Sequence, residues 1–199
     1  QKSPAKSSRP VSEKARRLAD EQRRKAWGDR IPTAYRDRRL EQFSPAVQVY
    51  AEKLLSGEAW CLYLFGGVGS GKTSFAVAVM YEWFETRHGW PVLVTAERMA
   101  MVLRDFDLAP HQVLGWKHAP LLVLDDIGAN RATEYVRDEL SGIISHRYDH
   151  RRPTIVTANL SLEELGKQWD KGDFARLASR LNEGVYVNFG AKDRRKDRK

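Results

Sequence analysis

Four residues in the first half of the chain have the types and the spacing of a phosphate-binding loop. Gly66, Gly71, Lys72 and Thr73 fit the pattern G-x-x-x-x-G-K-[ST], after a short apolar run and before an apolar helical pattern. Glycines let backbone N–H groups wrap an anion, and the helix N-terminus adds its positive end. We predict that Lys72 reaches the β- and γ-phosphates of a nucleotide and that the Thr73 hydroxyl ligates Mg²⁺. The predicted nucleotide-contacting residues are Gly66, Gly67, Val68, Gly69, Ser70, Gly71, Lys72, Thr73 and Ser74. The alternative is a glycine-rich turn without a ligand.

A second group is a pair of acids that ends an apolar run, "LLVLDDIG". Ligands of open α/β sheets lie at the carboxyl ends of the strands, which is where Asp125 and Asp126 are expected. We predict that Asp125 holds the Mg²⁺ shell and that Asp126 orients or deprotonates the attacking water. Because aspartate is also common where strands turn, the pair alone is weak evidence for a metal site, and it becomes strong evidence only together with the phosphate loop.

Two further sites are weaker when taken alone. Asn159 ends the apolar run "TIVTAN", where an amide can position the lytic water, although turn asparagines are frequent. Arg176 and Arg180 are four residues apart and share one helical face. An exposed arginine there can stabilise transition-state charge on a neighbour's nucleotide, whereas a solvated helix face is the commoner role of such a pair.

These residues require a parallel sheet to bring them together. Apolar strands are predicted at 59–65, 91–95, 120–126, 153–159 and 185–189, and helical patterns separate them. The helical patterns include one after the glycine-rich loop, one at 96–106 and one at 134–148. Ser161 opens a short helix with a capping box, Asp173 is expected to cap the next helix, and Gly184 is expected to end it.

Composition limits the function classes. The chain has 199 residues and 42% apolar residues, which suits one globular domain with tails. Residues 1–30 carry ten Lys or Arg and four Asp or Glu, residues 190–199 carry six and two, and the remainder has a net charge of −2. Basic ends indicate an anionic polymer, most often nucleic acid, or only solubility. We expect a disordered stretch at residues 1–10, a basic N-terminal segment at 1–30, an α/β domain at 31–189 and a basic tail at 190–199.

No apolar run is long enough to span a bilayer, and no signal-peptide core follows Gln1. We therefore expect a cytoplasmic protein without a membrane partner, and a sequence that is a piece of a longer one. The single cysteine, Cys61, cannot form an internal disulfide or a zinc site, so a core-packing role is predicted.

Together these stretches resemble the DnaC/DnaI helicase loaders and the IstB transposition ATPases of the AAA+ superfamily. The resemblance runs from about residue 31 to residue 189, and the order of the later blocks is more specific than the phosphate loop. The matching stretches are "IPTAYRDRRLEQF", "LFGGVGSGKT", "LLVLDDIG", "SHRYDHRRPTIVTANLS" and "RLASRLNEGVYVNF". The resemblance implies an α/β P-loop NTPase fold, with a five-stranded parallel sheet, helices on both faces and no C-terminal lid domain.

The resemblance also implies roles for single residues. Lys72 and Thr73 would form the Walker A site and the two aspartates the Walker B site, with ATP or ADP and Mg²⁺ as cofactors. Asn159 would be sensor 1, Arg180 an arginine finger acting on an adjacent subunit, and Arg176 a second residue acting in trans. Two departures stand out. Asp126 replaces the glutamate of most AAA+ proteins, which points to slower hydrolysis, and only about thirty residues precede the ATPase domain.

The resemblance implies ATP-dependent assembly into a homo-oligomer that binds DNA and a protein partner. A loader of bacterial or phage origin would bind a replicative helicase, whereas an IstB-like regulator would bind a transposase and duplex DNA. Arg98, Arg104 and Lys117, with Phe106 and Trp116 for stacking, are the candidate DNA contacts, although a solvated helix and a core tryptophan are the commoner roles of such residues. Two alternatives stay open: a small-molecule kinase with the same loop, and a nucleotide-gated DNA scaffold that barely hydrolyses ATP.

Overall fold

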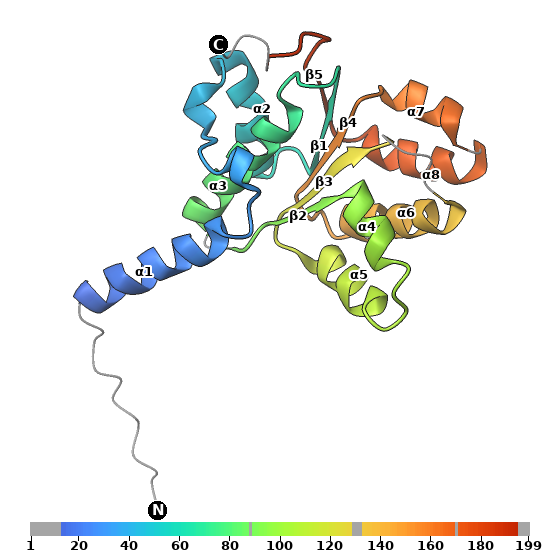
Figure 1. Cartoon of the computed structure of the whole chain (residues 1–199). Coiled ribbons are helices and arrows are strands. Elements are labelled where there is room, and N and C mark those ends of the chain that lie inside the picture. The colour runs from blue at the N-terminus through green and yellow to red at the C-terminus, as the bar shows by residue number, and fades with distance from the viewer. Residues whose placement is uncertain (1–12, 88, 129–132, 170, 195–199) are drawn as a thin grey trace, which may run out of the picture. The chain divides into compact units, whose positions relative to one another are not determined.

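A computed structural model of the chain describes residues 13–87, 89–128, 133–169 and 171–194 (Figure 1). The chain divides into two compact units, residues 1–36 and residues 37–199. The first unit contains helix α1 (Glu13–Gly28) and the 3-10 helix η1 (Thr33–Tyr35). Helix α1 lies within the basic N-terminal segment, and the stretch expected to be disordered, residues 1–10, lies outside the described residues.

The second unit contains a five-stranded parallel sheet, as the sequence predicts. Its strands are β1 (Cys61–Phe65), β2 (Val92–Thr95), β3 (Leu122–Ile127), β4 (Thr154–Ala158) and β5 (Val185–Asn188). They pair in the order β2-β3-β4-β1-β5. Burial on both faces explains why the strands are nearly continuous runs of apolar residues. Cys61 is buried in β1 and packs in this core, as predicted.

The strand order places β4 between the strand that precedes the glycine-rich loop and the strand that carries the aspartates. The strand that separates these two along the chain is β2, and it lies at the edge of the sheet instead. Nucleotide kinases usually place the acidic strand directly beside the phosphate-loop strand. The order seen here is that of the AAA+ and RecA-type ATPases and counts against the small-molecule kinase.

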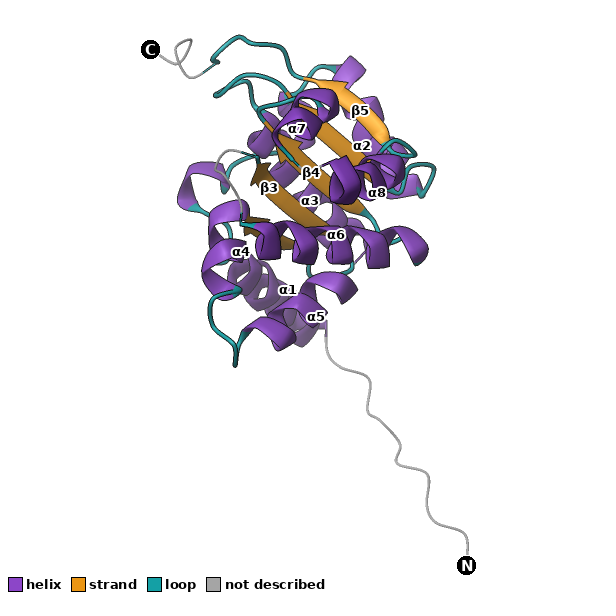
Figure 2. Cartoon of the chain, turned by 90° about the vertical axis from the view of Figure 1, so that its right-hand side faces the viewer, coloured by secondary structure: helices purple, strands orange, loops and turns teal. Residues whose placement is uncertain are grey.

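Helices cover both faces of the sheet (Figures 1 and 2). On one face lie α2 (Pro45–Ser56), which follows the 3-10 helix η2 (Leu40–Gln42), and α3 (Lys72–Arg87). The other face is covered by α6 (Glu134–Asp149) and α8 (Lys171–Leu181). The remaining helices are α4 (Ala96–Val102), α5 (Ala109–His118) and α7 (Leu162–Gln168). Among the described residues, no helix is long and apolar enough to cross a membrane.

Three helix boundaries were tested by the structure. The helix expected at 96–106 ends at Val102, and α5 was not predicted. The reason is Asp105, whose Oδ1 accepts the N–H groups of Asp107 and Leu108 at 3.1 Å each and so turns the chain. The Ser161 capping box is confirmed. The expected cap at Asp173 is wrong, because α8 already begins at Lys171.

The buried guanidinium of Arg147 joins α6 to the end of α5 and to the start of β4. Arg147, near the end of α6, is fully buried and donates to the carbonyl oxygens of Trp116 at 2.8 Å and Ala119 at 2.9 Å. It also donates to the Pro153 carbonyl at 2.6 Å and to the Thr154 hydroxyl at 2.9 Å. Burial lowers the pKa of Arg147 to about 9, so the guanidinium stays charged at neutral pH. Its partners are the C-terminal carbonyls of α5 and the chain just before β4, which fixes the packing of both.

Candidate active site

The glycine-rich loop joins β1 to α3 and has the backbone that its sequence requires. Gly66, Gly69 and Gly71 have φ values of 140°, 75° and 106°, which residues with a Cβ rarely adopt. Lys72 is buried at the start of α3, and its Nζ donates to the carbonyl oxygens of Gly66 at 2.8 Å and Gly67 at 2.9 Å. The loop therefore already curls around its own lysine, with the N-terminus of α3 behind it.

The segment after β5 packs against the outer side of this loop, a contact that the sequence did not predict. The Gly67 N–H donates to the Gly190 carbonyl at 2.8 Å, and the Arg194 N–H donates to the Gly69 carbonyl at 3.0 Å. A Cβ added at Gly69 would lie 2.0 Å from Oδ1 of Asp193. At least two of the loop glycines are thus required by the close approach of the chain's own C-terminal segment, in addition to any phosphate.

Asp125 is held in place by two hydroxyl groups. It is 7% exposed, and its Oδ1 accepts from Thr73 Oγ1 at 2.9 Å and from Thr157 Oγ1 at 2.7 Å. Burial raises the pKa of this carboxyl above its usual range, and the bonds from Thr157 and Thr73 act in the opposite direction. The predicted pairing of the phosphate loop with the acidic strand is therefore made directly through Thr73.

Asp126 leaves the regular strand geometry. Its φ is 60°, and the pairing of β3 with β4 shifts between Leu124 and Ile127, so a bulge directs this residue. The Asp126 N–H donates to Thr157 Oγ1 at 2.8 Å, and its Oδ1 accepts from Asn159 Nδ2 at 3.0 Å. Asn159 Oδ1 in turn accepts from Lys72 Nζ at 3.0 Å.

These contacts close a ring of hydrogen bonds between the start of α3, the carboxyl end of β3 and the end of β4. The ring runs from Lys72 through Asn159 and Asp126 to Thr157, and from there through Asp125 to Thr73, which is next to Lys72 in the sequence. The structure therefore brings together all five residues predicted from the Walker and sensor patterns. Thr157 is the member that sequence reasoning missed. A hydroxyl two residues before Asn159 was the available signal, because alternate strand residues face the same side.

The donor set fits a nucleotide with Mg²⁺. Thr73 and Asp125 offer two oxygen ligands, and Mg²⁺ typically takes one or two protein ligands and completes its shell with phosphates and water. The described residues contain no cluster of three or more His, Cys, Asp or Glu side chains that could hold a metal unaided. Inside the loop, the Ser70 hydroxyl is fully buried without a hydrogen-bond partner, as expected where a ligand supplies one.

Arg180 and Arg176 lie away from this ring. Helix α8 ends at Leu181, shortly before β5 begins, whereas the glycine-rich loop follows the end of β1. Because β1 and β5 are parallel, the two arginines lie towards the amino-terminal ends of the strands, whereas the phosphate loop lies at their carboxyl ends. Arg180 Nη1 donates to the Arg176 carbonyl at 3.3 Å, and its guanidinium lies 5.7 Å from the centre of the Tyr148 ring.

The predicted DNA contacts have mixed positions. Arg98 on α4 and Arg104 after it are exposed, and Lys117 at the end of α5 is partly exposed. Phe106 is 86% exposed, but stacking by Trp116 is wrong, because this side chain is 4% exposed and packs in the core. The apolar face of α5 turns Trp116 inward.

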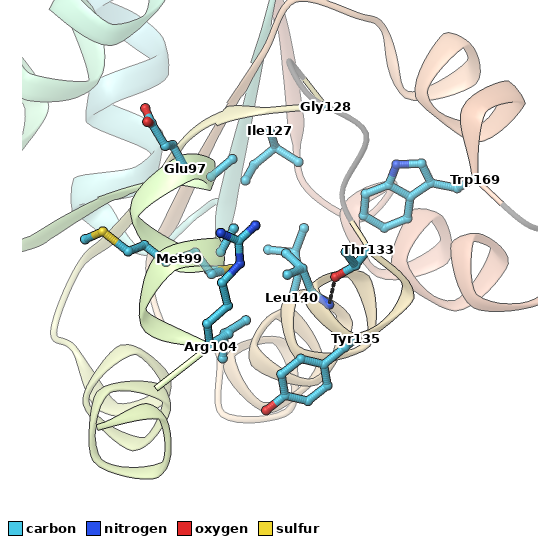
Figure 3. A pocket seen from close by; sticks show the side chains of 14 residues that line it. Glu97, Met99, Arg104, Ile127, Gly128, Thr133, Tyr135, Leu140 and Trp169 are labelled. Atoms are coloured by element: carbon cyan, nitrogen blue, oxygen red, sulfur yellow. Dashed lines mark hydrogen bonds between the residues drawn. The ribbon is translucent and has the colours of Figure 1, made fainter. Parts of the chain in front are cut away.

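A pocket of about 480 Å³ lies beside the carboxyl end of β3, between α4 and α6. Figure 3 shows the Arg104 side chain extending into it, with Leu140 and Trp169 among the apolar residues around it. The pocket thus adjoins the strand that carries Asp125 and Asp126, and no sequence pattern predicted it.

The model of one protein family, described as IstB-like ATP binding protein, matches residues 55–182. The chain belongs to this family. The match includes the loop, both aspartates, Asn159 and Arg180. The description of the family names ATP binding, and the matched range contains the hydrogen-bonded ring.

Curated relatives give the same affiliation. The replicative helicase loader DnaI of Bacillus subtilis (strain 168) is 32% identical over 130 residues, which are 64% of this chain and 42% of that protein. The replicative helicase loader DnaC of Escherichia coli (strain K12) is 26% identical over 132 residues, 64% of this chain and 53% of that protein. The chain thus spans about half the length of the curated relatives it matches.

A crystal structure of DnaI has the same fold, with a TM-score of 0.70 at 21% identity over 82% of this chain and 94% of that one. The predicted AAA+ fold and the helicase-loader and IstB affiliation are both confirmed. The chain is a helicase-loader-like AAA+ protein of an ATP-binding family.

Proposed function

We propose that this protein hydrolyses ATP at a site shared between two copies of the chain and uses the assembly to load a replicative helicase onto DNA. The observation that carries the proposal is the separation within one chain between the hydrogen-bonded ring and Arg180. The ring contains the groups that would bind a triphosphate and activate the attacking water. The arginine that would stabilise the transition state lies towards the other end of the strands.

The residues of the ring divide the work. The loop amides and Lys72 bind the phosphates, and Lys72 exchanges its carbonyl partners at Gly66 and Gly67 for phosphate oxygens. Thr73 and Asp125 hold Mg²⁺, which neutralises phosphate charge when bound. Asp126, directed by its bulge, accepts the proton of the attacking water. Asn159 bonds both Asp126 and Lys72, so it aligns the water with the γ-phosphate.

Arg180 must act on a second copy because of the length of the strands. A strand rises about 3.3 Å per residue, so the five residues of β1 separate the amino and carboxyl ends of the strands by roughly 16 Å. Arg180 lies towards the amino ends and the glycine-rich loop follows the carboxyl ends. In a neighbouring copy, the guanidinium can meet the γ-phosphate, and assembly then depends on nucleotide. Arg176, exposed one turn earlier on α8, is a second candidate for the same face.

The DNA and helicase parts of the proposal rest on other observations. The relatives are named replicative helicase loaders. Arg98 and Arg104 are exposed near the carboxyl edge of the sheet, where they can contact phosphates, and Lys117 adds a partly exposed charge. The basic residues 1–30 and 190–199 would add salt-dependent contacts. An IstB-like role, with a transposase and duplex DNA as partners, is the second candidate, because the matching family model is described as IstB-like.

The test is a complementation assay. ATP turnover is measured as protein concentration rises, for wild type, Arg180→Ala, Lys72→Ala and an equal mixture of the two variants. Specific activity of the wild type should rise with concentration. Each variant alone should lose roughly 10³-fold or more, which is the usual effect of an arginine finger. The mixture should recover activity, because the Lys72→Ala protein supplies its arginine to the intact loop of the Arg180→Ala protein.

The result that contradicts a shared site is a flat specific activity together with normal turnover by Arg180→Ala. Adding a replicative helicase with single-stranded DNA, and separately a transposase with duplex DNA, then distinguishes the two partner classes. The helicase role requires that the wild type, but not Lys72→Ala, increases the amount of helicase bound to DNA. A protein that binds ATP and DNA but turns over no ATP in any mixture would instead be the nucleotide-gated scaffold.

A further inference from the structure

Near the amino-terminal ends of the strands lies a cluster of four polar side chains, namely Tyr148, Arg151, Arg180 and Glu183. Tyr148 lies at the end of α6, and its ring packs edge-on against Trp60, just before β1, with centroids 5.4 Å apart. Two guanidinium groups lie near the same ring, that of Arg151 at 4.7 Å from its centre and that of Arg180 at 5.7 Å. The Tyr148 hydroxyl donates to Oε1 of Glu183. The cluster thus links α6, the end of α8 and the turn before β4.

Glu183 is fully occupied in this cluster. Besides the bond from Tyr148, its Oε2 accepts from both Nη1 and Nη2 of Arg151 at 3.3 Å. The Tyr148 bond first, and then Arg151, lower the pKa of the Glu183 carboxyl below its usual range, so the group stays charged. Both carboxylate oxygens therefore have partners that come from the end of α6 and the turn after it.

The backbone at Arg151 is strained. Its φ is 47°, and only one other non-glycine residue in the described part of the chain has a positive φ, namely Asp126 of the ring. A left-handed conformation is unfavourable for a residue with a Cβ, and such residues gather at functional sites. Here the turn presents the Arg151 side chain to Glu183.

The occupied state of Glu183 has a consequence for Arg180. Glu183 is the acid nearest to Arg180 in the sequence, and its N–H donates to the Arg180 carbonyl at 3.2 Å in the turn after α8. No ion pair joins the two side chains, and no other carboxylate in the described ranges pairs with Arg180. Among the described residues, the Arg180 guanidinium makes one hydrogen bond, to the Arg176 carbonyl at 3.3 Å, and its Nε is buried without a hydrogen-bond partner. Its charge is left for an anion from outside the chain.

We infer that Tyr148 and Arg151 are positioning residues that hold Glu183 away from Arg180 and so keep that arginine available to the nucleotide of a second copy. The inference rests on the proposed function, in which Arg180 acts in trans. The Tyr148 ring attracts the Arg180 guanidinium through its π face, whereas the charge of Arg151 repels it, and both restrict its direction. When the cluster is broken, Glu183 is released, pairs with Arg180 and neutralises it.

The experiment places Tyr148→Phe on one side of the shared site at a time. Phenylalanine keeps the ring and its contact with Trp60 and removes only the hydroxyl. In the donor mixture, Lys72→Ala/Tyr148→Phe supplies the arginine to Arg180→Ala. In the acceptor mixture, Lys72→Ala supplies it to Arg180→Ala/Tyr148→Phe. The donor mixture should be slower than the parent mixture by roughly two- to fivefold, the range expected when an exposed ion pair competes, and the acceptor mixture should be unchanged.

Two further donor variants show whether Glu183 is the cause. Arg151→Gly removes the guanidinium while suiting the left-handed backbone, so a loss of donor activity without loss of urea stability is expected. Adding Glu183→Gln to the Tyr148→Phe donor should restore activity, because the amide carries no charge to pair with Arg180. A purely structural role predicts equal losses in donor and acceptor and no rescue.

The outcomes separate the inference from the proposed function. If the parent mixture recovers activity but Tyr148→Phe and Arg151→Gly donors match it, Arg180 acts in trans without these residues, and the inference is overturned alone. Failure of rescue by Glu183→Gln also overturns it. If the parent mixture recovers nothing, the shared site itself is refuted, and the positioning role is refuted with it.

Discussion

The substitution Thr157→Val tests the ring at the member that the sequence did not reveal. The Thr157 side chain is 1% exposed, donates to Asp125 Oδ1 at 2.7 Å and accepts the Asp126 N–H at 2.8 Å. Valine has nearly the same shape and the same branched Cβ, so it removes two hydrogen bonds without opening a cavity. Any effect should therefore come from the polar contacts.

The magnitude follows from the two bonds. A hydrogen bond to a charged group contributes about 1.5–3 kcal/mol, and the partly buried Asp126 N–H loses its acceptor for about 1 kcal/mol more. Protonation of Asp125 reduces this loss of stability in part, because burial already raises the pKa of Asp125 and loss of the Thr157 hydrogen bond raises it further. We expect the free energy of unfolding to fall by about 2–4 kcal/mol. Urea denaturation followed by tryptophan fluorescence, without nucleotide, measures it.

Thr157→Ser is the matched control. It keeps the hydroxyl and loses one methyl group, for about 1 kcal/mol. ATP turnover should follow the hydroxyl, with serine close to wild type and valine strongly reduced, since Asp125 and Asp126 are both misplaced. The reasoning would be refuted by equal urea midpoints and equal turnover for valine and serine, because the hydroxyl would then hold neither acid.

Three further predictions concern the same fold. Gly69→Ala should weaken binding of a fluorescent ATP analogue, because φ is 75° and the new Cβ would lie 2.0 Å from Asp193 Oδ1; adding Asp193→Ala should recover part of the loss, and recovery of none would deny the contact. Arg147→Met should lower the free energy of unfolding by about 3 kcal/mol in urea, since the carbonyls it joins lose their donor, with Arg147→Lys intermediate; a stabilised variant would contradict this. Without nucleotide, the raised pKa of Asp125 means that its contribution to stability falls as pH rises from the unfolded value through the folded one. This loss of stability should shrink in Asp125→Asn, as measured by urea midpoints over that pH range.

Much of the fold follows from local patterns. The five strands are short, mostly apolar runs, and each matches a predicted run to within two residues. The parallel arrangement follows from helices between them. Lys72, Thr73, Asp125, Asp126 and Asn159 were predictable because parallel strands deliver their carboxyl ends to one edge. The strand order was not, since chain order alone is compatible with β2 or β4 between β1 and β3.

The missed features depend on contacts between distant segments. Thr157 reads as an ordinary strand threonine until β3 bulges beside it. The packing of residues 190–194 on the loop is hidden, because the sequence there shows only charge. Trp116 resembles a stacking residue beside Lys117, but the register of α5 turns it into the core. In each case the residue type or charge was visible in the sequence, but the distant segment that it contacts could not be predicted from the local sequence alone.

The strand order itself explains the form of the ring. In this strand order, β3 does not lie directly beside β1. Because β4 lies between them, Asn159 and Thr157 separate the charges and transmit contact through neutral groups. When Lys72 exchanges its bonds to the Gly66 and Gly67 carbonyls for phosphate oxygens, its Nζ can still donate to Asn159, whose Nδ2 donates to Asp126. The bound phosphate and the proposed base are then linked through one amide, directly after the middle strand.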